Sequence, residues 1–118
     1  MSAVRHAVYE DGRYDGRTLG EWLPDVVATI VARFNPVKVI LFGSLARGGE
    51  AKDIDLLVVL AAVEDKRRAA VAIRSAVEVP VPIDVIVTDP EEIARRGHLI
   101  GTVLEPALRE GRVVYERS

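Results

Sequence analysis

The chain has 118 residues, 49% hydrophobic and 29% charged, which is typical of one globular domain with its own core. Its formal net charge of −2 argues against a protein that grips long nucleic acid through the phosphates. The absence of cysteine excludes disulfides, thiolate nucleophiles and cysteine-ligated zinc, and no run of about 18 uncharged apolar residues indicates a membrane span.

Residues 1–17 form the least regular part of the chain, and we treat them as an extension that precedes a single domain over residues 18–118. The pair Asp11-Gly12 favours a small hairpin in this extension. The chain start does not resemble a signal peptide, which together with the lack of cysteine favours a cytoplasmic protein.

Apolar residues recur with helical spacing over residues 19–34, so an amphipathic helix is expected there. Its start can be placed in two ways. Thr18 and Glu21 have the spacing of a capping box, whereas Pro24 suits the first turn of a helix. We expect the helix to begin at about Pro24, after a turn over residues 18–23.

The rest of the chain alternates apolar runs of strand length with segments of helical spacing. This order predicts an α/β (α+β) fold with a small mixed sheet flanked by helices. The expected strands cover residues 37–42, 53–60, 83–88 and 112–115, and the expected helices cover 64–77, 90–96 and 103–110.

Two polar elements interrupt the apolar run around the first two strands. Asp53 and Asp55 stand at the head of the second strand, where alternate residues share a face about 6 to 7 Å apart. Two carboxylates this close repel each other unless a cation lies between them, and oxygen ligands favour Mg²⁺ or Mn²⁺. Gly43-Ser44 follows the first strand and begins a short helix, where free N–H groups and a hydroxyl suit phosphate. Gly43 lacks the Cβ that would keep a phosphate away from the backbone.

A third acid, Asp84, lies in the third strand. Taken alone, Asp84 is explained equally well by a functional role and by an exposed position on a half-solvated sheet. If the third strand pairs with the second, Asp84 reaches the face that carries Asp53 and Asp55. Three carboxylates at one site are the ligand set of two-metal phosphoryl-type transfer, with Asp84 the best candidate to accept the proton of the nucleophile.

These motifs resemble a known family. Gly43-Ser44-Leu45-Ala46-Arg47-Gly48, followed by Asp53-Ile54-Asp55-Leu56 and the later Asp84, closely resembles the minimal nucleotidyltransferases of the DNA polymerase beta superfamily. The likeness covers roughly residues 20 to 116. The loop over residues 45–52 is shorter than is typical of the family, and Lys52 stands where a serine commonly precedes the first aspartate.

The resemblance implies transfer of a nucleoside monophosphate, usually AMP from ATP, with release of pyrophosphate and with two Mg²⁺ ions as cofactors. Gly43, Ser44 and Arg47 would hold the triphosphate, and the three aspartates the metals. A phosphate contact of Arg47 is about as well supported as the alternative that Arg47 is a solvated loop arginine. A phosphate contact of Lys52 is less well supported. Family members of this size often act as antitoxins of HEPN-type toxins, either by adenylylating them or by binding them.

Three functions therefore stay open from the sequence. The first is a nucleotidyltransferase that modifies a hydroxyl on a partner protein, as the antitoxin of a toxin–antitoxin pair. The second is a non-catalytic antitoxin that sequesters a helical partner, which the short loop motivates. The third is a small-molecule nucleotidyltransferase, which would need a homo-oligomer to build its acceptor pocket.

Overall fold

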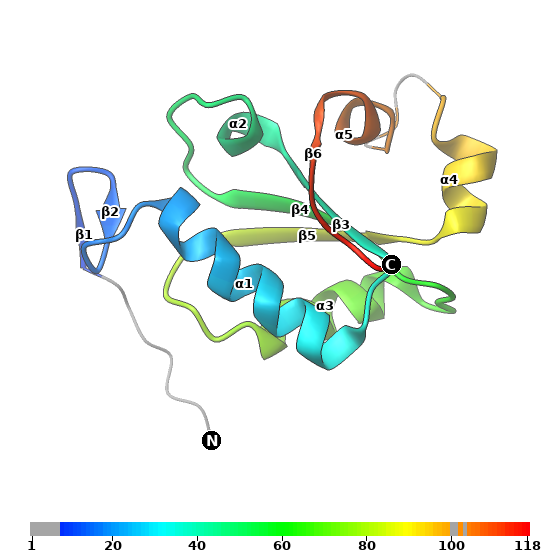
Figure 1. The fold of residues 1–118 in the computed structure, drawn as a ribbon, viewed down its shortest axis with the longest axis horizontal. Coiled ribbons are helices and arrows are strands. Elements are labelled where there is room, and N and C mark those ends of the chain that lie inside the picture. Colours follow the sequence, from blue (N-terminus) through cyan, green and yellow to red (C-terminus); the bar gives the residue numbers. More distant parts are fainter. Residues whose placement is uncertain (1–7, 100–101, 103) are drawn as a thin grey trace.

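The computed structural model describes residues 8–99, 102 and 104–118, and its centre is a four-stranded sheet (Figure 1). In this sheet β3 pairs antiparallel with β4 and β6, and β4 pairs parallel with β5. The expected small mixed sheet is therefore confirmed. In spatial order the strands are β5 (Ile83–Thr88), β4 (Ile54–Val59), β3 (Lys38–Phe42) and β6 (Arg112–Glu116).

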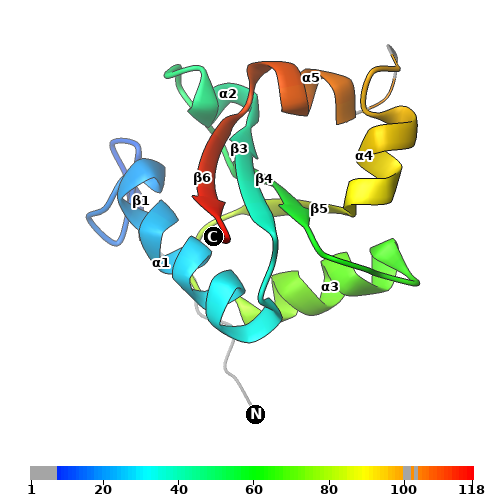
Figure 2. The same cartoon turned by 45° about the vertical axis from the view of Figure 1, so that its right-hand side comes forward.

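Helices cover both faces of the sheet (Figure 2). The helices α1 (Leu19–Phe34) and α3 (Lys66–Ala76) pack on one face. On the other face, α5 (Leu104–Glu110) buries Leu104 and Ala107 against Ile40 and Leu57 of the sheet; we call this the α5 face. Two short helices follow strands directly: α2 (Gly43–Ala46) follows β3, and α4 (Pro90–Arg96) follows β5.

The expected start of α1 at about Pro24 is wrong. The helix begins at Leu19, and Pro24 lies inside it. Both halves of the capping box are formed: the Glu21 amide donates to Thr18 Oγ1 at 3.2 Å, and the Thr18 amide donates to Glu21 Oε1 at 3.1 Å. The extra turn also buries Leu19 and Trp22. Cap and burial together outweigh the hydrogen bond that the proline cannot donate.

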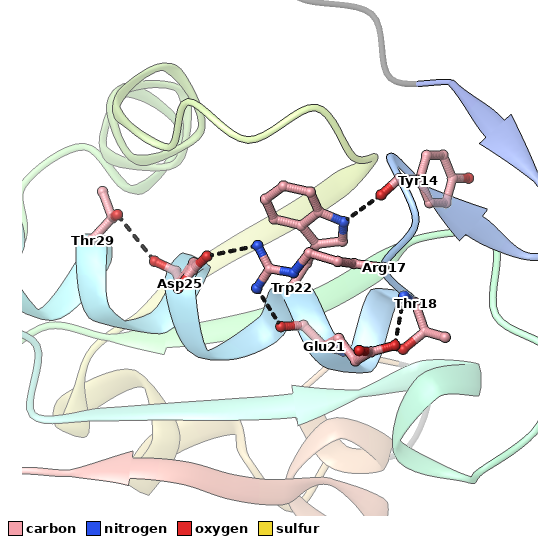
Figure 3. A network of polar contacts seen from close by, with 7 residues as sticks. All are labelled: Tyr14, Arg17, Thr18, Glu21, Trp22, Asp25 and Thr29. Carbon is pink, nitrogen blue, oxygen red and sulfur yellow. Dashed lines mark hydrogen bonds and ion pairs between the residues drawn. The ribbon is translucent and has the colours of Figure 1, made fainter.

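The expected hairpin is present as β1 (Tyr9–Glu10) and β2 (Arg13–Tyr14). Its two turn residues, Asp11 and Gly12, have φ values of 53° and 77°, as a tight hairpin turn requires. The Trp22 indole Nε1 donates to the Tyr14 carbonyl at 2.9 Å, and the Arg17 guanidinium lies 3.9 Å from the centre of the Trp22 ring (Figure 3). The hairpin is therefore fastened to the first turns of α1.

At the C-terminal end, α5 and β6 confirm the helix and final strand expected there. The expected first residue of the helix, Val103, lies outside the described residues. Pro106 falls in the first turn of α5, where a missing N–H costs nothing. Among the described residues, no helix is long and apolar enough to cross a membrane.

Candidate active site

Backbone pairing brings two of the three predicted carboxylates together. Asp55 and Asp84 are direct partners in the parallel register of β4 and β5, on strands about 4.8 Å apart. Leu57 and Ile86, two residues further along each strand, pack in the cluster under α5. Because side chains alternate along a strand, both carboxylates project from the α5 face. Asp53 stands just before β4 and is half-buried.

The pKa of Asp55 is affected by the two other acids. Burial raises the pKa of Asp55, and the charges of Asp53 and Asp84 and a hydrogen bond with Asp53 raise it further, to about 6. The Arg47 guanidinium opposes this shift. Asp55 therefore carries negative charge at an energetic cost, which a bound cation would lower.

The donor set fits a hard divalent cation, since it consists of carboxylate oxygens. In the part of the chain that the structure describes, no three His, Cys, Asp or Glu side chains are already arranged around one point as metal ligands. The backbone sets the spacing of Asp55 and Asp84, while the side chains would still turn toward an ion. We keep the assignment of the three aspartates as metal ligands as a proposal.

Gly43 is required for a reason that the sequence does not reveal. Its φ of +75° lies in the left-handed region that favours glycine. A Cβ on Gly43 would collide with the Asp55 carboxylate, with Asp55 Cγ only 3.1 Å away. The neighbour that demands a glycine is thus Asp55, across the Phe42–Asp55 pair of β3 and β4. The two halves of the sequence motif touch at this point.

The loop after Ser44 forms a compact turn. Arg47 donates its backbone N–H to the Gly43 carbonyl, Gly48 to that of Leu45, and Gly49 to that of Ser44, at 3.2 to 3.3 Å. The first N–H groups of α2 have no preceding helical carbonyl to bond, as at any helix start. The turn directly follows Gly43, the residue whose backbone packs on the Asp55 carboxylate.

The two basic residues of the loop have different surroundings. Arg47 lies 3.9 Å from Glu110 of α5, measured from its Nη1 to Glu110 Oε2. Lys52 is exposed and lines a cavity of about 450 Å³ between the loop, the hairpin and the start of α1. Within the described residues Lys52 forms no ion pair. The sequence does not indicate that Glu110 lies near Arg47, because Glu110 belongs to no motif and lies far along the chain.

A family model described as a nucleotidyltransferase domain matches residues 24–109. Among solved structures, a nucleotidyltransferase from Sulfolobus solfataricus is similar over 84% of this chain and 81% of that one, with a TM-score of 0.59 and 20% identity. A chain of a mutant MntA–HpeT toxin–antitoxin complex is similar over 81% and 73%, with a TM-score of 0.53 and 20% identity. No curated protein matched the chain. Since the family model spans well over half of its residues, this protein belongs to the nucleotidyltransferase domain family.

Proposed function

We propose that the protein is a Mg²⁺-dependent nucleotidyltransferase that moves a nucleoside monophosphate, AMP from ATP, onto a hydroxyl of a partner protein. The observation that carries the proposal is the in-register pairing of Asp55 with Asp84, with Gly43 packed on the Asp55 carboxylate. Family membership supports the reaction class. Residues 18–118 act in this proposal as one catalytic domain.

Each site residue has a role in the proposal. Asp53, Asp55 and Asp84 would hold the metal, and Gly43 and Ser44 would bind the triphosphate through backbone N–H groups. Bound Mg²⁺ supplies charge neutralisation at the phosphates and a lower pKa for the attacking hydroxyl. The hydroxyl oxygen bonds to the α-phosphorus while the bond from that phosphorus to the oxygen bridging the β-phosphate breaks. Asp84 accepts the hydroxyl proton, and pyrophosphate leaves.

The acceptor is best explained as a protein. Within the described residues, those after residue 18 are taken up by the sheet and the helices around it, which leaves little to enclose a small acceptor. A structurally similar chain occurs in a toxin–antitoxin complex. We therefore propose a helical HEPN-type toxin, encoded beside this protein, as the partner that is modified and neutralised.

Intact-mass spectrometry tests this proposal. The protein, ATP, Mg²⁺ and the product of the neighbouring gene are incubated together, and the neighbour should gain the mass of one AMP. The Asp53→Asn/Asp55→Asn variant should give no adduct, whereas Asp65→Asn, a change at an acid that only caps α3, should leave it unchanged. Absence of an adduct with every nucleoside triphosphate, although the two proteins bind, would refute the transfer reaction.

A second candidate is a non-catalytic antitoxin that binds its partner, and one surface favours it. Beside its core stripe, α1 has a second apolar stripe that faces β6 across an open groove of about 640 Å³. A helix with so little polar surface is typically covered on both sides. The groove is lined by Leu23, Pro24, Val27, Ala28, Val31, Ala32, Arg112, Val114 and Tyr115.

The two candidates differ in what they need. If binding suffices, the Asp53→Asn/Asp55→Asn variant still neutralises the toxin in a growth assay, and Ala28→Glu in the groove abolishes neutralisation. If transfer is needed, the aspartate variant fails to neutralise although it binds the toxin as tightly as the unmodified protein.

A further inference from the structure

The C-terminal helix reaches the candidate active site through a chain of ion pairs. Arg109 of α5 contacts Glu105 at 2.7 Å through Nε and Glu110 Oε1 at 3.0 Å through Nη1. The second oxygen of Glu110 faces Arg47 at 3.9 Å. Glu110 thus bridges two arginines, one on its own helix and one in the loop that follows the Gly43-Ser44 turn.

The end of α5 is held tightly against the strand that leads to Gly43. Gly111 follows Glu110 directly, and its N–H donates to the Ala107 carbonyl at 2.9 Å. A Cβ on Gly111 would lie 2.5 Å from Ile40 Cγ2 and 3.1 Å from the Leu41 carbonyl oxygen. The backbone directly after α5 therefore meets β3 without room for a side chain, which limits where Glu110 can lie.

Arg47 lies between the candidate site and α5. Its backbone N–H donates to the carbonyl of Gly43, the residue that packs on the Asp55 carboxylate. Its guanidinium lies 3.9 Å from Glu110 of α5. An arginine side chain is long and carries much rotamer entropy, so a single loop arginine at the surface would sample many positions. The Glu110 carboxylate, which Arg109 also contacts, gives the Arg47 guanidinium an oppositely charged partner on the side of α5.

We propose that Glu110 is a positioning residue, which holds Arg47 where the triphosphate of the bound nucleotide lies. This inference rests on the nucleotide transfer proposed above. It predicts that loss of the Glu110 charge weakens nucleotide binding and leaves the bound nucleotide to react at the same rate. The C-terminal helix thereby becomes part of the nucleotide site, although it carries no residue of the family motif.

Titration calorimetry with Mg²⁺-ATP tests the inference, and α5 offers a matched control. Glu110→Gln should weaken binding about three- to fivefold, the upper part of the range expected for an exposed ion pair. Glu105→Gln removes the same charge from the same helix and the same Arg109, but not from Arg47, and should leave binding unchanged. In the transfer assay Glu110→Gln should raise KM for ATP with kcat unchanged, and thermal unfolding of both variants checks that each is folded.

A double substitution shows whether Glu110 acts through Arg47. Arg47→Gln should weaken binding at least as much as Glu110→Gln, and adding Glu110→Gln to it should have no further effect. Equal weakening by Glu105→Gln, an undiminished effect of Glu110→Gln beside Arg47→Gln, or no effect of Glu110→Gln would overturn the positioning role alone. Failure of the unmodified protein to bind Mg²⁺-ATP would overturn the proposed function as well.

Discussion

Gly43 begins α2 directly after β3, and the space left by its missing side chain is occupied by the carboxylate of Asp55 on β4. The backbone of Gly43 has a left-handed φ of +75°, and its missing Cβ leaves room for the Asp55 carboxylate. The two residues are separated by a loop in sequence, but Phe42, the residue before Gly43, pairs with Asp55 across β3 and β4. A substitution at either position should therefore disturb the other residue.

Gly43→Ala is expected to damage both folding and nucleotide binding. The methyl group must displace the Asp55 carboxylate, and the left-handed backbone costs a non-glycine residue about 1 kcal/mol or more. We expect a loss of about 1 to 3 kcal/mol in the free energy of unfolding, measured by urea denaturation, and at least about tenfold weaker Mg²⁺-ATP binding. Gly49→Ala in the same loop, where nothing lies within 4 Å of an added Cβ, is the control. Equal losses in both variants would contradict the explanation.

Asp55→Asn should stabilise the metal-free protein in a pH-dependent way. The folded protein raises the pKa of Asp55 from 3.8 to about 6, so it holds the proton more strongly than the unfolded chain does. Ionisation therefore lowers stability as the pH rises through that range, and an amide removes this cost.

Thermal unfolding in a chelator should give a higher Tm for Asp55→Asn than for the unmodified protein at pH values above 6, where Asp55 is ionised. The difference should shrink as the pH falls toward 3.8. Saturating Mg²⁺ should raise the Tm of the unmodified protein more than that of the variant. A variant that is less stable at neutral pH would show that Asp55 is held by favourable contacts.

At the scale of elements, α1 shows how a helix start is decided by its cap and its burial together. Pro24 is a common first-turn residue, and by local preference alone it marks the start. The capping box at Thr18 and the burial of Leu19 and Trp22 move the start one and a half turns earlier. The capping box is a local interaction, whereas the burial of Leu19 and Trp22 depends on tertiary contacts. The spacing of apolar residues indicates those contacts but not how much they stabilise the helix start.

Thr18→Ala should destabilise the protein by about 1 kcal/mol, because the Glu21 amide loses its acceptor at the helix start. Thr29→Ala is a matched control in the same helix, since Thr29 Oγ1 donates only to the Asp25 carbonyl within the helix. Urea denaturation of the two variants compares them directly. Similar values for both would mean that the capping box adds nothing, and that Leu19 and Trp22 hold the first turn by packing alone.

The strands and helices were largely predictable from sequence because each carries its own local pattern of apolar residues. The segments at β3, β4 and β5 have the length and β-branched content of buried strands, and α4 has both its cap and its first-turn proline. The position of Glu110 beside Arg47 was not predictable, because it depends on how α5 packs back on β3. Local patterns do not contain that docking.

At the scale of the whole molecule, the candidate site is assembled by long-range pairing. Asp55 and Asp84 become partners only when the chain has passed through α3 and returned as β5 parallel to β4. From the sequence, Asp84 was expected to reach the other aspartates only if its strand pairs with theirs. The structure shows this pairing of β5 with β4. The site should therefore be fully formed only in the folded protein, and a nucleotide that binds there should stabilise the fold.

Mg²⁺-ATP at about a hundredfold excess over its Kd should add about 2.7 kcal/mol to the free energy of unfolding and raise the Tm by several degrees. Scanning calorimetry with Mg²⁺ alone, ATP alone and both together separates the contributions. The Asp53→Asn/Asp55→Asn variant should show no shift with the pair of ligands. A shift of the same size in that variant would place the nucleotide elsewhere on the molecule.

The bond between Trp22 and Tyr14 also gives this protein a built-in optical signal. The chain has a single tryptophan, so all of its indole emission comes from the point where the hairpin meets α1. Loss of the Tyr14 contact or of the Arg17 guanidinium over the ring would change the colour and intensity of that emission. Detachment of the hairpin can thus be followed by fluorescence without a label, separately from events at the carboxylates.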